Sequence, residues 1–332
     1  MNSSKISANN LVLGLVKGYE FEQIKPFLVS LRACGYKGNL CLLTCRLSSA
    51  TQQALQKYAE QNQVILHPFP DFSLLSFPYK IKNGQLAFKE VHPHQLLQLY
   101  PLNKLYIQFI NAAASPEKEN SHLTKCRISK LFLNAWCVRY PLYYLYLSEY
   151  GKSYENIMLT DTRDVLFQAD PFGFDFDGLC CFLENEEKTI NSCEFNSNWI
   201  LKGFSEDALR DIGHEKISCS GTTIGTRSAV MRYLETMVDY LIQLKTQFMG
   251  IDQGVHNYIL RKGLVGDVKF YDNHHGPVLT MHHTGEDKIR FDSDGYVINE
   301  DGSVINVLHQ YDRQSSEIRS KMLVHQESEC AF

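Results

Sequence analysis

Two aspartates, Asp161 and Asp164, follow directly on a short apolar run at residues 157–159, and a second apolar run at residues 165–167 comes next. We expect residues 157–159 to form a buried strand that carries both carboxylates at its carboxyl end. Charges at the tip of a buried strand need an oppositely charged partner or a metal ion. Carboxylate oxygens are hard ligands that suit Mg²⁺ or Mn²⁺. The sequence therefore predicts a divalent cation site at this strand end.

Three further side chains have the chemistry to complete such a site. His309 stands near the end of a late apolar run and would supply a nitrogen ligand, which Mn²⁺ tolerates better than Mg²⁺ does. Arg139 and Arg163 are of the type that contacts phosphate oxygens in bidentate pairs. A cation and arginines together would neutralise the charge of a nucleotide diphosphate. The alternative interpretation is a structural network of arginines and aspartates that closes the strand end.

The elements that must position these residues follow an alternating pattern. We expect strands at residues 11–16, 40–44, 64–66, 157–159 and 179–183, and helices over residues 21–34, 123–150 with a break near Pro141, and 228–247. A further helix is expected to start at a cap on Ser48 or Ser49. Strand and helix in alternation predict a doubly wound α/β sheet, in which ligands bind at the carboxyl ends of the strands.

The domain organisation predicted from the sequence is simple. We expect a flexible N-terminus over residues 1–10, one domain over residues 11–313 and a fraying polar tail over residues 314–332. Residues 68–121 contain six prolines and are predicted to be an insertion of loops and short elements. Residues 295–307 are predicted to form a C-terminal β-hairpin that turns at residues 300–303.

Charge and hydropathy limit the possible partners. The 332 residues carry a formal net charge of -4, whereas nucleic-acid-binding proteins usually have a basic surplus. No apolar run approaches the roughly 20 residues that span a bilayer, and the polar first ten residues lack the apolar core of a secretory signal. We therefore expect a cytoplasmic protein with no nucleic-acid partner and no transmembrane segment. Peripheral contact with a membrane is compatible with these features.

Three blocks resemble the GT-A glycosyltransferases, especially the glycogenin-like and galactosyltransferase-like families. The first block is Arg139, then a helix, an apolar strand, the acidic tip DTRD at residues 161–164 and Asp-Pro at residues 170–171. The second, GIDQ at residues 250–253 followed by Asn257, is similar to the G-D-Q-x-x-x-N block of those families. The third is His309, which is similar to their late metal-binding histidine. Together the blocks cover about half of the chain in the expected order.

The resemblance has two departures. The acidic tip is D-x-x-D where those families have D-x-D, and counting back from Asp170 aligns Asp164 with their second aspartate and Thr162 with their first. Asp161 would then bind the metal directly or through water, or contact the ribose. The chain also lacks the Gly-x-x-Lys-Pro-Trp sequence that usually follows the late histidine in those families.

The resemblance implies a fold, a reaction and a set of site residues. The fold would be a Rossmann-like, mixed but mostly parallel sheet flanked by helices, and the reaction would be transfer of a sugar from a nucleotide-diphosphate-sugar to a hydroxyl of a glycan, a lipid-linked sugar or a protein. Asp161, Asp164 and His309 would bind Mn²⁺ or Mg²⁺. The donor would be held by Leu13, Gly14, Gly18, Tyr19, Arg139, Arg163 and Asp161.

On the acceptor side, the resemblance implies that Asp252 and Gln253 face the donor sugar and the acceptor. An inverting enzyme needs a carboxylate to take the acceptor proton, for which Asp252 is the first candidate and Glu184 the second. A sugar-phosphate nucleotidyltransferase is one alternative function, although residues 16–20 offer a single lysine and no glycine-rich loop. A non-catalytic protein that binds nucleotide sugars is the other.

Overall fold

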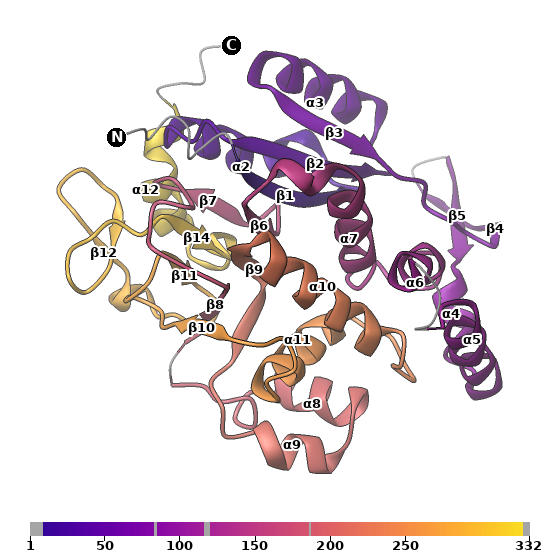
Figure 1. The fold of residues 1–332 in the computed structure, drawn as a ribbon. Helices are drawn as coiled ribbons and strands as arrows, with labels where there is room; N and C mark the ends of the chain where they lie inside the picture. The colour runs from indigo at the N-terminus through magenta and orange to yellow at the C-terminus, as the bar shows by residue number, and fades with distance from the viewer. Residues whose placement is uncertain (1–8, 83–84, 116–119, 186, 328–332) are drawn as a thin grey trace.

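A seven-stranded central sheet runs through the protein (Figure 1). The computed structural model describes residues 9–82, 85–115, 120–185 and 187–327. The strands, in sheet order, are β10 Val268–Tyr271, β8 Leu179–Leu183, β9 Ser218–Thr226, β6 Asn156–Thr160, β1 Asn10–Lys17, β2 Asn39–Cys45 and β3 Val64–Pro68. Only β9 runs against its neighbours, and the other six strands are parallel to one another. The α/β class and the mostly parallel sheet predicted from the sequence are therefore confirmed.

Helices cover both faces of this sheet because its strands are apolar on both sides. In β1, Leu11 and Leu13 belong to one core cluster, whereas Val12 and Val16 belong to the cluster on the opposite face. One face is covered by α2 Phe21–Ala33 and α3 Ser49–Asn62, and the other by α7 Arg139–Tyr150, α10 Arg227–Leu241 and α11 Ile251–Arg261. The Ser48 hydroxyl caps α3 by accepting a hydrogen bond from the amide of Thr51 at 3.3 Å, as the sequence predicted.

A second, three-stranded sheet packs beside the first. It consists of β11 Val278–Thr280, β14 Val307–His309 and β7 Val165–Phe167, in that order. Residue Ile298 does bridge to Val304 around the expected turn, but the short β12 Arg290–Phe291 is the strand that pairs with β13 Val297–Ile298. The predicted hairpin over residues 295–307 is confirmed near its turn, where the Asn299 amide donates to the Ser303 carbonyl and the Ile305 amide to the Val297 carbonyl. It is wrong at its end, because Val307 belongs to β14, which pairs with β7 and β11.

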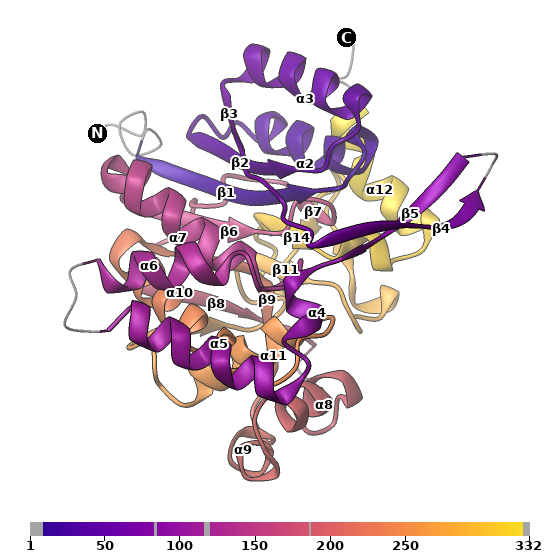
Figure 2. The same cartoon turned by 90° about the vertical axis from the view of Figure 1, so that its right-hand side faces the viewer.

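The segment predicted as an insertion contains more regular structure than loops. It forms β4 Leu75–Lys82, β5 Gln85–Val91, α4 Pro93–Leu96 and α5 Tyr100–Ala113, and Figure 2 shows the β4–β5 hairpin projecting from the body. The helical region that follows breaks between α6 Ser121–Ser129 and α7, so the break predicted near Pro141 is misplaced. Pro141 lies in the first turn of α7, where a missing amide proton removes no helical hydrogen bond.

The remaining helices lie at the edges of the fold. They are α8 Glu194–Gly203, α9 Glu206–Ile212, the one-turn helices at Gly151–Ser153, Glu286–Lys288 and Tyr311–Arg313, and α12 Ser316–Glu327. The predicted fraying tail is instead helical over α12, because Ile318 and Met322 are buried against the second sheet. Burying a side chain of this size contributes about 1.5–3 kcal/mol.

Parts of three predictions lie outside the described residues: residues 1–8 of the flexible N-terminus, residues 83–84 and 116–119 of the insertion, and residues 328–332 of the tail. Asn10 already belongs to β1. Within the described ranges, no helix combines the length and the apolar character needed to cross a membrane.

Candidate metal and substrate site

Asp161, Asp164 and His309 converge between the two sheets. Asp161 follows the last residue of β6, and His309 is the last residue of β14. Because Val165 of β7 pairs with His309, the preceding Asp164 lies beside the imidazole. One ligand atom from each of the three residues can be chosen so that all lie within 4.8 Å of one another. The structure thus brings together the three side chains predicted to bind a metal.

His309 carries a buried nitrogen that lacks a hydrogen-bond partner. Its side chain is fully buried, its Nε2 lies 3.5 Å from Asp161 Oδ2, and no group in the described part of the chain is placed to hydrogen-bond that nitrogen. On the other side, Nδ1 lies 3.6 Å from the Cys219 Sγ. An unsatisfied buried polar atom costs about 1–3 kcal/mol. Two carboxylates and this nitrogen fit Mn²⁺ as a ligand set, and Mg²⁺ less well.

The electrostatics of the three residues differ. Burial alone would raise the pKa of Asp161, but the Arg139 guanidinium and His309 lower it below its ordinary value. Burial raises the pKa of Asp164, and the charge of Asp161 adds to this effect. Burial alone would lower the pKa of His309, but Cys219 and the two aspartates raise it well above its ordinary value. His309 binds a metal only in its neutral form, so a cation at this cluster would displace the imidazole proton and take over its pairing with the two carboxylates.

Arg139 joins the metal cluster to the acceptor-side residues. Its Nη1 donates to Asp161 Oδ1 at 2.6 Å, and its Nη2 donates to Asp252 Oδ2 at 2.6 Å. The same Asp252 oxygen accepts a hydrogen bond from the Tyr140 hydroxyl at 3.3 Å. The structure therefore places Arg139 as a bridge between two carboxylates, whereas the sequence suggested a contact to phosphate.

Gln253 organises the other predicted acceptor-side residues. Its amide nitrogen donates to Glu184 Oε1 at 2.9 Å and to Asn196 Oδ1 at 3.2 Å, while Asn257 holds the Gln253 carbonyl at 3.0 Å. Glu184 follows β8 and is only 3% exposed. Burial raises the pKa of both Glu184 and Asp252. The GIDQ block thus forms the first turn of α11 and faces the ends of β8 and β9.

Arg163 contributes to a cationic rim on the other side of the cluster. Its Nη2 donates to Asp312 Oδ2 at 3.1 Å, and the Nη1 of Arg313 donates to the same oxygen at 3.1 Å. Arg313 Nη2 also lies 3.8 Å from Asp164 Oδ2. Two guanidinium groups thus share the Asp312 carboxylate, so the rim keeps net positive charge beside Asp164. Anionic oxygens would be attracted to this position.

The four residues predicted to hold the nucleoside differ in their positions. Leu13 is fully buried in the middle of β1 and pairs with strands on both sides, so the structure does not place it at the site. Gly14 leaves room for the methyl group of Thr162, which would lie 2.3 Å from an added Cβ. Gly18 turns the chain at a φ of 70°. Burial and the charge of Asp161 raise the pKa of Tyr19, so Tyr19 borders the cluster.

Gly221 was not singled out as a site residue, yet it packs against the metal cluster. Its carbonyl accepts a hydrogen bond from the Asp161 amide at 2.8 Å. A Cβ at this position would lie 2.5 Å from His309 Nε2 and 2.6 Å from Asp161 Oδ2. Residues 219–226 consist mostly of small hydroxyl residues and glycines, a composition that allows the backbone to approach another group closely. It did not indicate that the approach is to His309, because the two residues are far apart in the sequence.

We expect the substitution Gly221→Ala to weaken Mn²⁺ binding by about 10- to 100-fold, the usual effect of displacing the groups that orient metal ligands. The added methyl group would displace the His309 imidazole and the Asp161 carboxylate away from residue 221. Titration calorimetry with Mn²⁺ measures the effect. Gly151→Ala is the matched control, because Gly151 follows the end of α7 opposite to Arg139 and an added Cβ there would first meet the Leu147 side chain, at 3.1 Å. Unchanged Mn²⁺ affinity in Gly221→Ala would exclude this cluster as the binding site.

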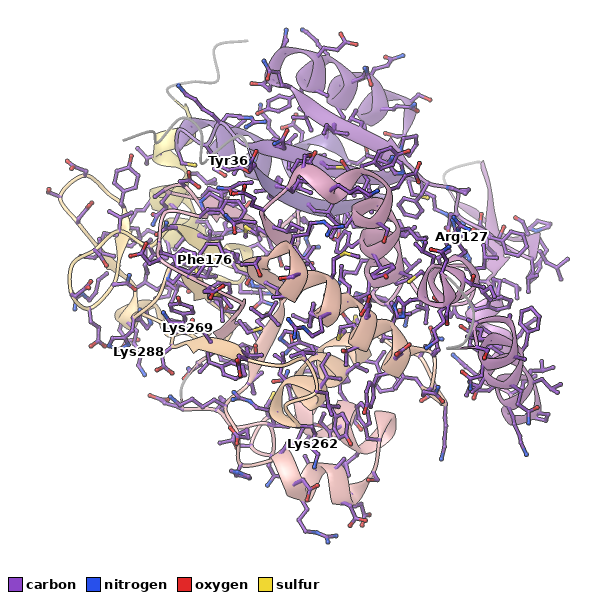
Figure 3. The ribbon with its side chains drawn as sticks, viewed as in Figure 1. Tyr36, Arg127, Phe176, Lys262, Lys269 and Lys288 are labelled. Carbon is purple, nitrogen blue, oxygen red and sulfur yellow. The ribbon has the colours of Figure 1, made fainter. Side chains whose placement is uncertain are left out.

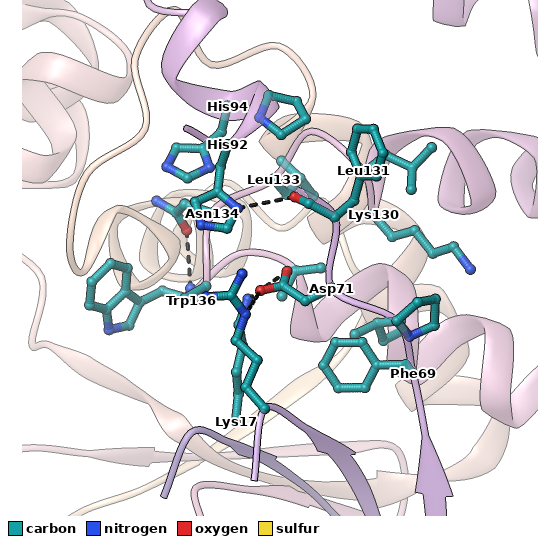
Figure 4. Close-up of a pocket in the computed structure, with 17 residues that line it drawn as sticks. Lys17, Phe69, Asp71, His92, His94, Lys130, Leu131, Leu133, Asn134 and Trp136 are labelled. Carbon is teal, nitrogen blue, oxygen red and sulfur yellow. Dashed lines mark hydrogen bonds and ion pairs between the residues drawn. The ribbon is translucent and has the colours of Figure 1, made fainter. Parts of the chain in front are cut away.

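A separate pocket of about 250 Å³ lies at the carboxyl ends of β1, β2 and β3 (Figure 4). Its lining includes Lys17 of β1, Arg46 after β2 and Phe69 after β3, together with the exposed Trp136. Asp71 forms ion pairs with both Lys17 and Arg46. The pocket therefore has aromatic walls and a largely neutralised cationic floor.

Neither the protein-family models nor the curated proteins with which the chain was compared match its sequence. The assignment of a function must therefore be argued from the geometry of the site.

Proposed function

We propose that the protein is a divalent-metal-dependent glycosyltransferase of the GT-A type that uses a nucleotide-diphosphate-sugar donor. The observation that carries this proposal is the cluster of Asp161, Asp164 and His309 with its unsatisfied imidazole nitrogen. The cluster lies at the carboxyl end of β6, where α/β sheets bind ligands. The mostly parallel sheet and the order of the three sequence blocks support the same class.

Each group near the cluster has a role in this proposal. A bound Mn²⁺ or Mg²⁺ would neutralise charge on the donor diphosphate as the sugar leaves. Arg163 and Arg313 would contact phosphate oxygens at the cationic rim. Arg139 is a positioning residue, because its two donors hold Asp161 toward the cluster and Asp252 toward the acceptor side.

Glu184 fits proton transfer better than Asp252 does. Asp252 Oδ2 already accepts hydrogen bonds from Arg139 at 2.6 Å and from Tyr140 at 3.3 Å, so this oxygen is occupied and less free to receive an acceptor hydroxyl. Glu184 accepts a hydrogen bond from neutral Gln253 and forms no ion pair within the described ranges. Burial raises its pKa, which brings a carboxylate closer to the range suited to a general base. If the reaction inverts the sugar, Glu184 would take the acceptor proton.

Incubation with a panel of nucleotide sugars tests the proposal, with Mn²⁺, Mg²⁺ or a chelator present. We expect release of a nucleoside diphosphate that depends on the metal. An inverting enzyme would also lose turnover in Glu184→Gln while keeping its affinity for the nucleotide. Unchanged turnover in that variant would remove Glu184 from the mechanism without affecting the metal assignment.

Two outcomes would favour the alternative functions. Release of pyrophosphate from a nucleoside triphosphate and a sugar phosphate would show a nucleotidyltransferase. Metal-dependent binding of nucleotide sugars with no turnover, even when glycan, lipid and protein acceptors are supplied, would show a binding protein.

A further inference from the structure

Exposed apolar side chains are concentrated in one segment of the protein. Half of the large apolar side chains that are exposed within the described ranges fall between Phe72 and Phe109. The most exposed of them are Leu75 at 65%, Leu105 at 61%, Phe109 at 59% and Leu99 at 58%. Scattered exposed leucines are ordinary, but a contiguous apolar patch usually marks an interaction surface.

Helix α5 presents apolar residues to solvent as well as to the core. Tyr106 and Ile110 are buried in the core cluster. On the outward side, Leu102, Leu105 and Phe109 recur at the spacing of one helix face. The core leaves this second face uncovered, although covering it would remove apolar area from water.

The projecting β4–β5 hairpin lies on the same side of the protein as α5. In Figure 1 both lie at the right-hand edge, and in Figure 2 this side faces the viewer. Leu75 and Phe77 of β4 are exposed there. We define the apolar face by Leu75, Phe77, Leu99, Leu102, Leu105 and Phe109. It combines a helix face with the base of a protruding hairpin.

The charge of this segment is opposite to that of the whole chain. Residues 72–114 contain four lysines against one glutamate, a formal net charge of +3, whereas the chain as a whole has -4. Lys104 lies on α5, and the neighbouring α6 carries the exposed Arg127, which Figure 3 shows on the same side. An apolar face with flanking cations is complementary to an anionic lipid surface.

The apolar face also adjoins the pocket at the carboxyl ends of β1, β2 and β3. Phe72, His92 and His94 of the segment line that pocket, together with the exposed Leu131 and Trp136. A surface bound at the apolar face would therefore lie beside the strand ends that lead to the candidate site.

We infer that the apolar face docks the protein on anionic lipid bilayers as a peripheral, non-spanning contact. This inference does not depend on the proposed catalytic function. Leu99, Leu102, Leu105 and Phe109 enter the boundary between headgroups and acyl chains, while the exposed Lys104 and Arg127 contact lipid phosphates and carboxylates. Salt weakens the electrostatic part of the binding because it screens these charges.

Co-sedimentation of the full chain with vesicles tests the inference, using phosphatidylcholine vesicles with and without phosphatidylserine. We expect binding to the phosphatidylserine vesicles that is weakened by salt. The double variant Leu105→Glu/Phe109→Glu should bind at least tenfold more weakly. The matched control is Phe195→Glu/Leu201→Glu, which places the same two charges on exposed apolar positions of α8 and should bind like the wild type.

Three outcomes would overturn the inference. The first is a wild-type protein that does not bind anionic vesicles. The second is equal loss of binding in the α5 variant and the α8 control, which would show a response to net charge alone. The third is a wild-type oligomer that separates into monomers in the α5 variant without any vesicle binding, which would assign the apolar face to contacts between copies of this chain.

Discussion

The substitution Asp164→Asn is expected to reduce metal-dependent turnover of the nucleotide sugar by about 100- to 1000-fold, the usual loss when one strong electrostatic contact to a transition state is removed. The change deletes one anionic ligand of the cluster and keeps the size of the side chain. Titration with Mn²⁺ should show a parallel loss of affinity. Asp170→Asn serves as the control, because Asp170 lies in the same segment and its carboxylate accepts a hydrogen bond from the Phe172 amide at 2.9 Å, which the Asn oxygen can also accept.

In the absence of metal, the Asp164→Asn variant should be at least as stable toward unfolding as the wild type. Because burial raises the pKa of Asp164, its ionisation opposes folding, and this cost increases as the pH rises through the pKa of the folded state. The amide cannot ionise, so the variant avoids that cost at pH 7. Urea unfolding in a chelator measures the difference. Full turnover in a folded Asp164→Asn protein would rule out the assigned metal site, and inactivity caused by unfolding would be visible in the same denaturation curve.

The substitution Arg139→Met is expected to lower the free energy of unfolding by about 3–5 kcal/mol, the range for removing one partner of a buried ion pair. It leaves Asp161 and the nearly fully buried Asp252 without their shared guanidinium. Chemical denaturation followed by circular dichroism measures the loss. Adding Asp252→Asn should restore part of the stability, because the amide removes one of the two unpaired charges.

Arg163→Met provides the comparison for that prediction. The Arg163 side chain is 38% exposed, and its partner Asp312 is partly exposed, so its removal should cost less than about 1 kcal/mol. Equal losses in the Arg139 and Arg163 variants would show that the Arg139 bridge is no more important for folding than an ordinary surface pair.

The sequence predicted the parts of the fold that depend on local patterns. The strand before Asp161 and the cap at Ser48 were predictable because an apolar run or a capping residue acts over a few neighbouring positions. Helix α5 was not, because the prolines around it indicated loops, while its folding depends on Tyr106 and Ile110 packing against distant helices. Helix α12 was missed because its sequence is polar, while its position depends on Ile318 and Met322 packing against the second sheet.

In the candidate site, too, the features that depend on local sequence were predictable and the long-range contacts were not. The three metal-binding candidates were found because each residue type is rare at the end of a buried strand. The pairing of Arg139 with Asp252 could not be inferred, since 113 residues separate them and nothing local to either residue indicates the other. Leu13 was assigned to the donor site through the resemblance, whereas the structure places it fully buried in the middle of β1, because a family resemblance does not show where along a strand the chain leaves the core.

The seam between the two sheets has a consequence for the motions of the protein. Asp161 extends from the large sheet, whereas His309 belongs to the small one, so a cation bound by the three ligands would add a link to the apolar contacts through which the two sheets pack. Without a cation, repulsion between Asp161 and Asp164 acts at this seam. We therefore expect the amides of β7 and β14 to exchange faster with solvent in the metal-free protein than in the metal-bound protein. A bound cation would slow this local opening because it links segments that lie far apart along the chain.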